Sequence, residues 1–538
     1  MKSAHSYYIL SRILFQYLPQ DFLKLEYQEQ AVLNAKKILE EYGGVFISDV
    51  VGLGKTYISA MLAGQIDGRT LVIAPPVLLD KSNPGSWLNV FSDFRIPADF
   101  ESIGKLDEIL RNGTEKYKNI IIDEAHRFRT ESNLTYEQLA EICRGKRVIL
   151  VTATPYNNSP KDILNQIKLF QKARRSTIPN LPDLEGFFNG LDKKLKKQDK
   201  KKNYDEHIRI VRENAKEIRE KVLKYLMVRR TRTEISKYFA HDLAKQNLKF
   251  PELDDPKPLY YQLNEEEDNI FNDTVKLISQ KFTYARYTPL LSKYHKGTIN
   301  SLEEQSQKNM GSFMKILLVK RLESSFYAFK KSIERFISSY ENFIKAYNEG
   351  SVYISKKYTN KIFEYLENDD DEAIQHLIDE GKAERYDSKD FTDEFEKDLK
   401  KDLEILKKIK SNWEEIERDP KLLTFLDELK TNQILQNKLI VFTESKETAE
   451  YLLKNIDKKF GNIALCFTGG SGEDTRDKVI ENFDARVKNP KDDYRILIST
   501  EVLSEGVNLH RSNVVINYDI PWNPTRMMQR VGRINRVD

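Results

Sequence analysis

Residues 49–56 read DVVGLGKT and restrict the possible fold of this chain more than any other stretch. The apolar run 44–48 before them predicts a buried strand, and residues 57–63 after them predict a helix. A glycine-rich loop that ends in Lys-Thr and joins a strand to a helix is typical of a phosphate-binding loop. The sequence therefore predicts an α/β domain with this loop at the edge of its sheet.

The residue types of the loop suit a phosphorylated ligand. Gly52 and Gly54 allow backbone N–H groups to curve around phosphate oxygens. Lys55 would neutralise phosphate charge, and the hydroxyl of Thr56 is a suitable ligand for Mg²⁺. Asp49 occupies a position where the strict pattern has glycine. The ordinary alternative is a glycine turn followed by an exposed lysine.

A second motif, NIIIDEAH at residues 119–126, is an apolar strand that ends in two carboxylates. Groups at the carboxyl ends of parallel strands face the ligand crevice of such sheets. Asp123 could hold hydrated Mg²⁺, and Glu124 could polarise a water molecule for attack on a γ-phosphate. The alternative is a strand end that carries two solvated acids.

Further apolar runs predict two parallel sheets, one in each half of the chain. Continuous apolar runs indicate strands that are buried on both faces, with helices as crossovers. In the first half they lie at residues 70–74 and 147–151, and in the second half at residues 438–442, 462–467, 494–498 and 513–517. The second half has no phosphate loop of its own and ends in QRVGRINR at residues 529–536. Arginines three apart share a helical face and suit contact with phosphate oxygens, although a basic surface helix is the ordinary alternative.

In their order, these motifs resemble those of superfamily-two helicase-type ATPases, and within them the Swi/Snf-type double-stranded DNA translocases. The arginine motif is similar to that of the bacterial branch. Further matching segments are Tyr27-Gln28, the sequence TATP at 152–155, MVRRTR at 227–232, Ser499-Thr500, EGVNL at 505–509 and DIPWNP at 519–524. The resemblance implies two RecA-like lobes with large helical insertions, and ATP and Mg²⁺ as cofactors.

The resemblance also assigns roles to individual residues. Gln28 would read adenine, and arginines of the second lobe would complete the site, so that hydrolysis requires closure of the lobes. The implied catalytic residues are Lys55, Asp123, Glu124, Gln529, Arg533 and Arg536. The implied nucleotide-binding residues are Gln28, Val51, Gly52, Leu53, Gly54, Lys55, Thr56 and Tyr57, with Thr56 and Asp123 as metal ligands. Thr443, Thr468, Gly469, Ser499 and Thr500 are candidate contacts to nucleic-acid phosphates.

We predict three regions. Residues 1–238 would form the first lobe, with a helical protrusion at about 160–226. Residues 239–430 would contain an entry strand of the second lobe at 257–263 and a helical insertion with long helices at 314–347 and 391–416. Residues 431–538 would form the second lobe. The seven lysines between residues 193 and 202 predict a solvated loop, with a phosphate-contacting arm as the alternative.

Composition narrows the class of protein. A charged fraction of 32% and the absence of an apolar run of about 20 residues argue against a membrane protein. The only two cysteines, Cys143 and Cys466, imply neither a disulfide framework nor a zinc cluster and fit the cytoplasm. Because the sequence stops directly after the arginine motif, we expect it to belong to a longer protein.

The expected function is an ATPase that moves along duplex DNA by contacting its phosphates. A protein partner could dock on the helical insertions or on terminal domains beyond this sequence. One alternative is a helicase that separates strands of DNA or RNA. Another is a nucleotide-gated clamp that holds DNA or a protein without moving.

Overall fold

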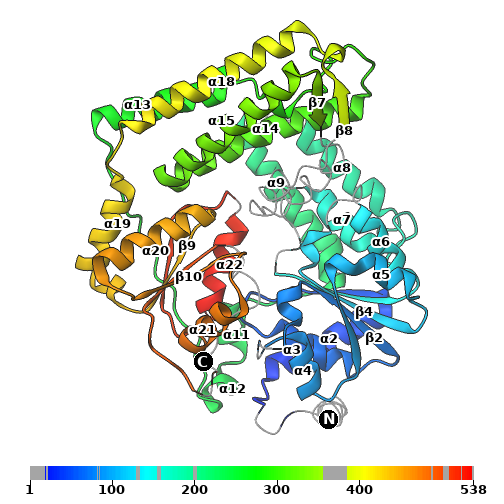
Figure 1. Cartoon of the computed structure of the whole chain (residues 1–538). Coiled ribbons are helices and arrows are strands. Elements are labelled where there is room, and N and C mark those ends of the chain that lie inside the picture. Colours follow the sequence, from blue (N-terminus) through cyan, green and yellow to red (C-terminus); the bar gives the residue numbers. More distant parts are fainter. Residues whose placement is uncertain are drawn as a thin grey trace, which may run out of the picture. The chain divides into compact units, whose positions relative to one another are not determined.

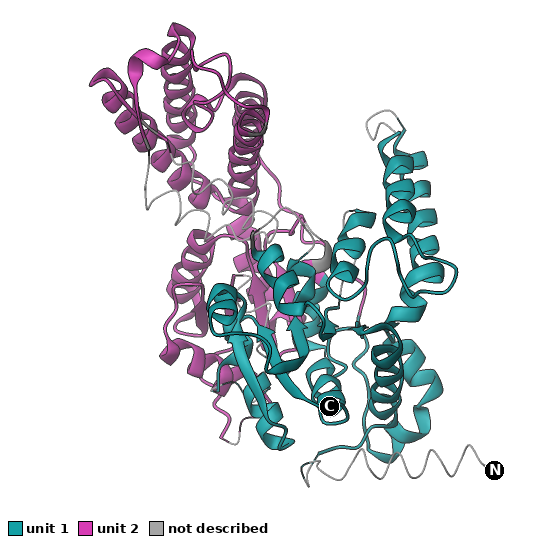
Figure 2. Cartoon of the chain, turned by 90° about the vertical axis from the view of Figure 1, so that its right-hand side faces the viewer, with its two compact units in different colours: residues 1–253, 504–510, 528–538 teal, residues 254–503, 511–527 magenta. Residues whose placement is uncertain are grey.

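The computed structural model describes residues 19, 22–81, 83, 85–128, 134–153, 155, 159–197, 203–354, 384–485, 487, 489–500, 508–522 and 524–535. The chain divides into two compact units, which are coloured separately in Figure 2. Unit 1 comprises residues 1–253, 504–510 and 528–538, and unit 2 comprises residues 254–503 and 511–527.

Unit 1 is built on a six-stranded parallel sheet with the order β3-β2-β4-β5-β1-β6 (Figure 1). Its strands are β1 (Gly44–Ile47), β2 (Arg69–Ala74), β3 (Ala98–Ser102), β4 (Tyr117–Asp123), β5 (Arg147–Val151) and β6 (Met227–Val228). Alternate residues of a strand point to opposite faces of a sheet. Phe46, Ile120 and Ile122 accordingly belong to one buried core, and Val45, Ile47 and Ile121 to another. The uninterrupted apolar runs thus reflect burial on both faces.

Helices cover both faces of this sheet, and a set of them extends from it as a protrusion. The helices next to the sheet are α2 (Glu26–Tyr42), α3 (Lys55–Ala63), α4 (Trp87–Asp93), α5 (Leu106–Arg111) and α6 (Leu134–Cys143). The protrusion contains α7 (Pro160–Lys168), α8 (Leu184–Lys196), α9 (Tyr204–Ile218), a π-helical turn (Arg219–Leu223) and α10 (Lys224–Leu226). After β6 the chain forms α11 (Arg232–Tyr238) and α12 (Ala240–Lys245). The lysine run begins in α8, and its residues 198–202 lie outside the described residues.

Unit 2 contains a four-stranded parallel sheet with the order β10-β11-β9-β12. Its strands are β9 (Leu439–Phe442), β10 (Ala464–Phe467), β11 (Ile496–Ser499) and β12 (Val514–Asn517). The helices next to it are α19 (Pro420–Thr431), α20 (Lys446–Phe460) and α21 (Glu473–Phe483). The last helix, α22 (Pro524–Ile534), begins in unit 2 and ends among the residues of unit 1. The predicted fold of two RecA-like parallel sheets with helical insertions is therefore confirmed.

The helical insertion of unit 2 has a hydrophobic core of its own. It contains α13 (Glu265–Lys276), α14 (Ser301–Ser324), α15 (Phe326–Asn348), α18 (Asp393–Glu414) and the strand pair β7 (Ser351–Ile354) and β8 (Glu384–Asp387). Trp413 of α18 packs edge-on against Phe326 and Phe329. The buried Asp402 carboxylate accepts hydrogen bonds from Thr283, Ala285 and Tyr340.

Two details of this region differ from the predictions. The single helix predicted at 314–347 is two helices, because Ser325 is extended and its hydroxyl accepts from the N–H of Ala328, which starts α15. The predicted strand at 257–263 is wrong in that these residues join no sheet, although α13 follows them as expected.

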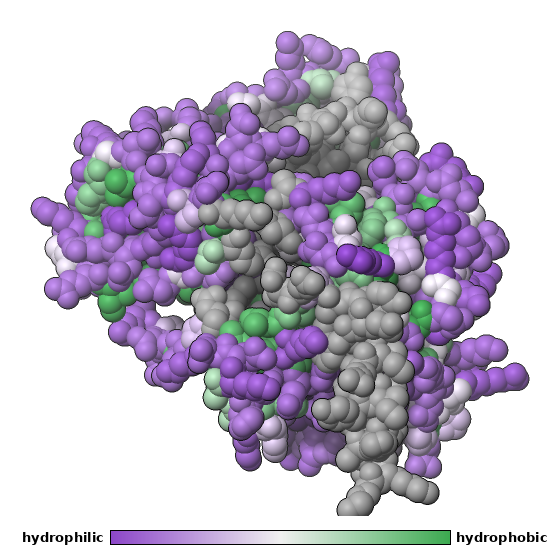
Figure 3. Space-filling model, turned by 90° about the horizontal axis from the view of Figure 1, so that it is seen from below, coloured by the Kyte–Doolittle hydropathy of each residue, from purple (hydrophilic) through white to green (hydrophobic). Residues whose placement is uncertain are grey.

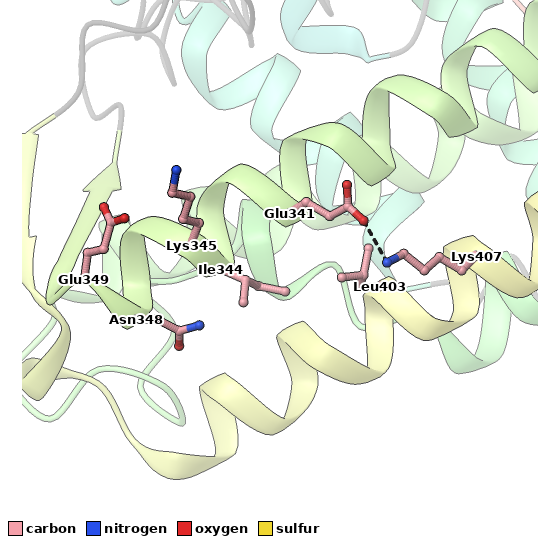
Figure 4. A pocket seen from close by; sticks show the side chains of 7 residues that line it. All are labelled: Glu341, Ile344, Lys345, Asn348, Glu349, Leu403 and Lys407. Carbon is pink, nitrogen blue, oxygen red and sulfur yellow. Dashed lines mark ion pairs between the residues drawn. The ribbon is translucent and has the colours of Figure 1, made fainter.

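A pocket of about 390 Å³ lies between α15 and α18 (Figure 4) and is lined by Glu341, Ile344, Lys345, Asn348, Glu349, Leu403 and Lys407.

On the face shown in Figure 3, hydrophilic residues predominate and apolar ones form small separate groups. None of the helices that the structure describes has the length and apolar character needed to cross a bilayer.

Candidate functional site

The predicted phosphate loop lies between β1 and α3, at the carboxyl end of its strand. Gly52 and Gly54 have φ values of 90° and 80°, which a side chain would strain. Gly54 is the N-cap of α3, so no side chain caps the first helical turn. The N–H groups of that turn and the positive end of the helix dipole suit an anion. Thr56 and Tyr57 follow in this turn, and the Tyr57 ring packs against Phe22 and Phe94.

Lys55 lies among acidic groups of the same unit. Its Nζ donates to the carbonyl oxygen of Asp49 over 3.0 Å. Burial lowers the pKa of Lys55, whereas the charges of Glu124, Asp123 and Asp49 oppose that change. These carboxylates, which follow or end β1 and β4, therefore favour the charged form of Lys55.

Asp123 ends β4 and is held by a tryptophan that the sequence analysis did not identify. Trp87 of α4 donates its Nε1–H to Asp123 Oδ2 over 2.7 Å, and the N–H of Glu124 donates to Oδ1 over 2.8 Å. Burial and the charge of Glu124 raise the pKa of Asp123 to about 7. No sequence signal marked Trp87, because it lies 36 residues before Asp123 in a separate helix.

Glu124 has an unusual backbone conformation for a residue with a side chain, with φ 48° and ψ 44°. Such left-handed residues cost free energy and often occur at functional sites. His126 Nδ1 lies 3.1 Å from Glu124 Oε2 and 3.3 Å from Thr152 Oγ1, so it connects the predicted motifs at 119–126 and 152–155. Burial would raise the pKa of Glu124, but the hydrogen bond from His126 and the charges of Lys55 and Arg533 lower it to about 2. Glu124 is therefore a carboxylate at neutral pH.

Gln28 lies beside the loop, in the first turn of α2, and only 5% of it is exposed. Its Nε2 makes long hydrogen bonds of 3.4 Å to Leu53 O and to the Tyr27 hydroxyl. Its Oε1 is buried and has no hydrogen-bond partner. A Cβ atom on Gly54 would lie 2.5 Å from Gln28 Nε2, so the loop glycine makes room for this amide.

Asp49, which departs from the strict loop pattern, is fully buried and paired with Arg230. The backbone N–H and Nε of Arg230 donate to Asp49 Oδ1 over 2.8 and 3.2 Å, and Nη2 donates to Oδ2. Arg230 follows β6, which pairs with β1, so the sheet brings the two residues together. The resemblance had marked residues 227–232 without assigning a role to Arg230.

The arginine motif lies on α22, and its last part belongs to unit 1. Gln529, Arg530 and Arg533 are buried, and the charge of Arg533 affects the pKa values of Lys55 and Glu124. A Cβ atom on Gly532 would lie 2.4 Å from Val51 Cγ1, so glycine allows the helix to approach the phosphate loop. The structure thus brings Arg533 to the charged group formed by Lys55 and Glu124. Arg536 lies outside the described residues.

The candidate nucleic-acid contacts of unit 2 are mostly buried. Thr443 and Ser499 are fully buried, Thr468 and Thr500 nearly so, and Gly469 is exposed. The Thr443 hydroxyl donates to Asp519 Oδ2 over 2.6 Å, and the Ser499 hydroxyl donates to the carbonyl oxygen of Thr500 over 2.8 Å. A phosphate contact through these two hydroxyls would require an exchange of internal hydrogen bonds. Their role as contacts stays a prediction.

Asp519, from the DIPWNP segment, is the centre of a buried polar network. Its Oδ2 accepts from Ser324 and Thr443, each over 2.6 Å, and its Oδ1 accepts from the Glu444 N–H over 2.8 Å. The Ser324 hydroxyl also lies 2.7 Å from that of Thr448. The network joins the end of α14 to the loops after β9 and β12.

We expect Asp519→Asn to lower the free energy of unfolding by about 2 kcal/mol, because an amide offers two donors where Asp519 offers only acceptors. One buried partner would then face a donor and lose its hydrogen bond. Urea unfolding of wild type and variant measures the difference. Asp493→Asn, at an exposed position of the same unit, is the matched control. Equal stability of the Asp519 variant and wild type would contradict a structural role for the network.

The residues at the loop fit an adenine nucleotide with Mg²⁺. The uncapped turn of α3 and Lys55 offer donors and positive charge for phosphates. The free acceptor Oε1 of Gln28 suits the 6-amino group of adenine, which is a donor. The Thr56 hydroxyl and the Asp123 carboxylate are oxygen ligands of the kind that Mg²⁺ prefers.

The sequence of this chain is similar to those of helicase-type proteins. Residues 96–321 match the model of the SNF2-related domain, and residues 420–538 match that of the helicase conserved C-terminal domain. The chain is 23% identical to the uncharacterized ATP-dependent helicase YqhH of Bacillus subtilis over 97% of this chain and 74% of YqhH. It is 33% identical to the ATP-dependent RNA helicase uap56 of Schizosaccharomyces pombe, over 23% of this chain and 26% of that protein. The Sulfolobus solfataricus SWI2/SNF2 ATPase core in complex with dsDNA aligns with a TM-score of 0.34 and 16% identity, over 96% of this chain and 86% of that one.

Proposed function

Because this chain matches the models of the SNF2-related domain and the helicase conserved C-terminal domain, we propose that it hydrolyses ATP to move along double-stranded DNA. The observation that carries the proposal is the geometry of unit 1. Lys55 lies at the loop, Trp87 and the N–H of Glu124 hold Asp123, and His126 Nδ1 lies 3.1 Å from Glu124 Oε2. Gly532 lets the helix that carries Arg533 approach Val51 of the loop. Cations for the phosphates and a carboxylate for the water molecule are the parts that phosphoryl transfer to water requires.

Each residue of the site would have its own role in the reaction. The backbone of Gly52 and Gly54 and the side chain of Lys55 would hold the phosphates. Thr56 and Asp123 would hold Mg²⁺, which when bound neutralises charge on the phosphate oxygens. Glu124, fixed by His126, would orient the attacking water. Gln529, Arg533 and Arg536 would complete the site, with arginine stabilising the charge that develops at the γ-phosphate.

Movement along DNA would follow from the position of Arg533 in the chain. The arginine helix α22 begins seven residues after β12 ends, so a shift of the second sheet would be transmitted to α22. Closing and opening of the site during each ATP cycle would therefore move the second sheet relative to a bound backbone. The predicted phosphate contacts Thr443, Thr468, Gly469, Ser499 and Thr500 lie at or directly after the carboxyl ends of β9, β10 and β11. Such contacts position a protein on nucleic acid without reading its sequence.

ATPase rates with different polymers test the proposal. We expect duplex DNA to stimulate hydrolysis more than single-stranded DNA, RNA or no polymer. The rate should rise with duplex length until it reaches a plateau, because a moving enzyme leaves short duplexes more often. Displacement of a triplex-forming strand should occur without separation of a plain duplex. Lys55→Ala provides the inactive control.

The same measurements identify the alternatives. Separation of a plain DNA or RNA duplex would indicate a strand-separating helicase and contradict the proposal. An ATPase rate that is stimulated by duplex DNA but independent of its length would indicate a clamp that binds without moving.

A further inference from the structure

Arg230 connects the two ends of the proposed nucleotide site. At the phosphate end, Arg230 donates hydrogen bonds to the side-chain carboxylate of Asp49. The backbone carbonyl oxygen of Asp49 accepts a hydrogen bond from Lys55. The carbonyl oxygen of Arg230 also accepts from the N–H of Val50 over 3.3 Å. Arg230 therefore contacts both of the first two residues of the phosphate loop, Asp49 through its side chain and Val50 through its backbone. Exposure of the two paired side chains is 0% for Asp49 and 14% for Arg230, so solvent screens their attraction little.

At the other end, Arg230 holds the residue that precedes Gln28. Its Nη1 donates to the carbonyl oxygen of Tyr27, and its guanidinium carbon lies 5.2 Å from the centre of the Tyr27 ring. Arginine can do both at once because its planar group has several donors and stacks on aromatic faces. Lysine has one nitrogen and could hold Asp49 or Tyr27, but not both in this geometry.

Tyr27 in turn fixes the orientation of the Gln28 amide. The Tyr27 hydroxyl and Gln28 Nε2 both donate to Leu53 O, over 3.5 and 3.4 Å. Because a carbonyl oxygen only accepts, the amide atom that faces it must be Nε2 rather than Oε1. Oε1 is then left as a buried acceptor without a hydrogen-bond partner.

An acceptor held in this position distinguishes the two purines. Adenine carries an amino group at position 6 and donates a hydrogen bond, whereas guanine carries an oxygen there and only accepts. With guanine bound, Gln28 Oε1 and the guanine oxygen at position 6 would be two acceptors that face each other without a hydrogen. A site with a fixed hydrogen-bonding group rejects the ligand that cannot satisfy it more strongly than a flexible site does.

We infer that Arg230 is a positioning residue that sets the preference for adenine over guanine nucleotides, an inference that rests on the proposed ATPase function. Through Tyr27, Arg230 holds the Gln28 amide in one orientation. Through Asp49, it fixes the position of this amide relative to the phosphate loop. Without Arg230 the first turn of α2 loses its connection to the loop, and the Gln28 amide can rotate to present Nε2 to a guanine oxygen.

The test compares kcat/KM for ATP and GTP in variants of this pair. Arg230→Ala alone leaves Asp49 buried without its partner and endangers folding. The double variant Asp49→Gly with Arg230→Ala removes both charges together and installs the glycine of the usual loop pattern. Arg230→Lys is the second variant, and Arg229→Ala, at the exposed neighbouring arginine, is the matched control. Circular dichroism melting checks that each variant is folded.

We expect the ratio of kcat/KM for ATP to that for GTP to fall about tenfold in the double variant and in Arg230→Lys, and to stay unchanged in Arg229→Ala. KM for ATP should rise more than kcat falls, because Arg230 touches no reacting atom. A purely structural role would lower both values of kcat/KM together and leave the ratio unchanged.

An unchanged ratio in folded variants would overturn the inference. Gln28→Ala separates this outcome from a failure of the proposed function. If wild type hydrolyses ATP and Gln28→Ala lowers the ratio while the Arg230 variants do not, only the role of Arg230 is wrong. If wild type hydrolyses neither nucleotide, the proposed function itself fails.

Discussion

Exchange of Glu124 for glutamine is expected to slow ATP hydrolysis by about 10²–10⁴-fold while ATP binding persists. Glutamine has nearly the same size and keeps one oxygen, so the phosphate loop and its lysine remain in place. It lacks the negative charge that would orient and polarise the attacking water. Since the pKa of Glu124 is lowered to about 2, the wild-type group carries this charge throughout the neutral range.

Two measurements check this expectation: phosphate release, which should be lost, and binding of a fluorescent ATP analogue, which should be retained. Glu115→Gln, at an exposed position just before β4, is the matched control and should behave as wild type. Robust hydrolysis by the Glu124 variant would remove this carboxylate from the proposed reaction.

The second large effect is expected from Arg533→Ala, which should reduce kcat by about 10³–10⁵-fold. Arg533 is buried, and its charge lowers the pKa values of both Lys55 and Glu124, so its field reaches the phosphate loop and the proposed water-orienting group. In the proposed reaction, this arginine would stabilise charge that appears only in the transition state. Lys55 remains to hold the phosphates, so affinity for ATP should change much less than kcat.

Arg533→Lys refines the test, because lysine keeps the charge but loses the planar fork of donors. We expect it to recover only part of the lost rate. Arg212→Ala, which removes an exposed arginine of the protrusion, controls for loss of positive charge in unit 1. A kcat of Arg533→Ala equal to that of wild type would show that α22 contributes no charge to the reaction.

The fold was largely predictable because its signals are local. A strand that is buried on both faces must be apolar at every position, as Ile120, Ile121 and Ile122 are, and this pattern is visible without any knowledge of neighbours. The order of motifs correctly predicted a helicase-type ATP-dependent enzyme with similarity to the SNF2-related domain. The break between α14 and α15 was missed, because a serine inside a helical pattern is common and only its N-cap geometry marks the boundary.

The contacts that hold the site together were not predictable, because they join residues far apart in the sequence. Arg230, the partner of Asp49, lies 181 residues away, and Ser324, one partner of Asp519, lies 195 residues away in α14. Thr443 looked available for phosphate because it follows a strand, yet it is buried against Asp519. Whether a polar group at a strand end is exposed depends on which distant element covers it.

The Asp519 network has a mechanical consequence for the helical insertion. The two long helices α14 and α15 meet at Ser325, and this vertex is anchored to the second sheet through Ser324. A displacement of either helix would therefore act on Asp519, in the loop between β12 and α22. A partner that binds the tip of the insertion would therefore act on the chain directly before α22, the helix that carries Arg533.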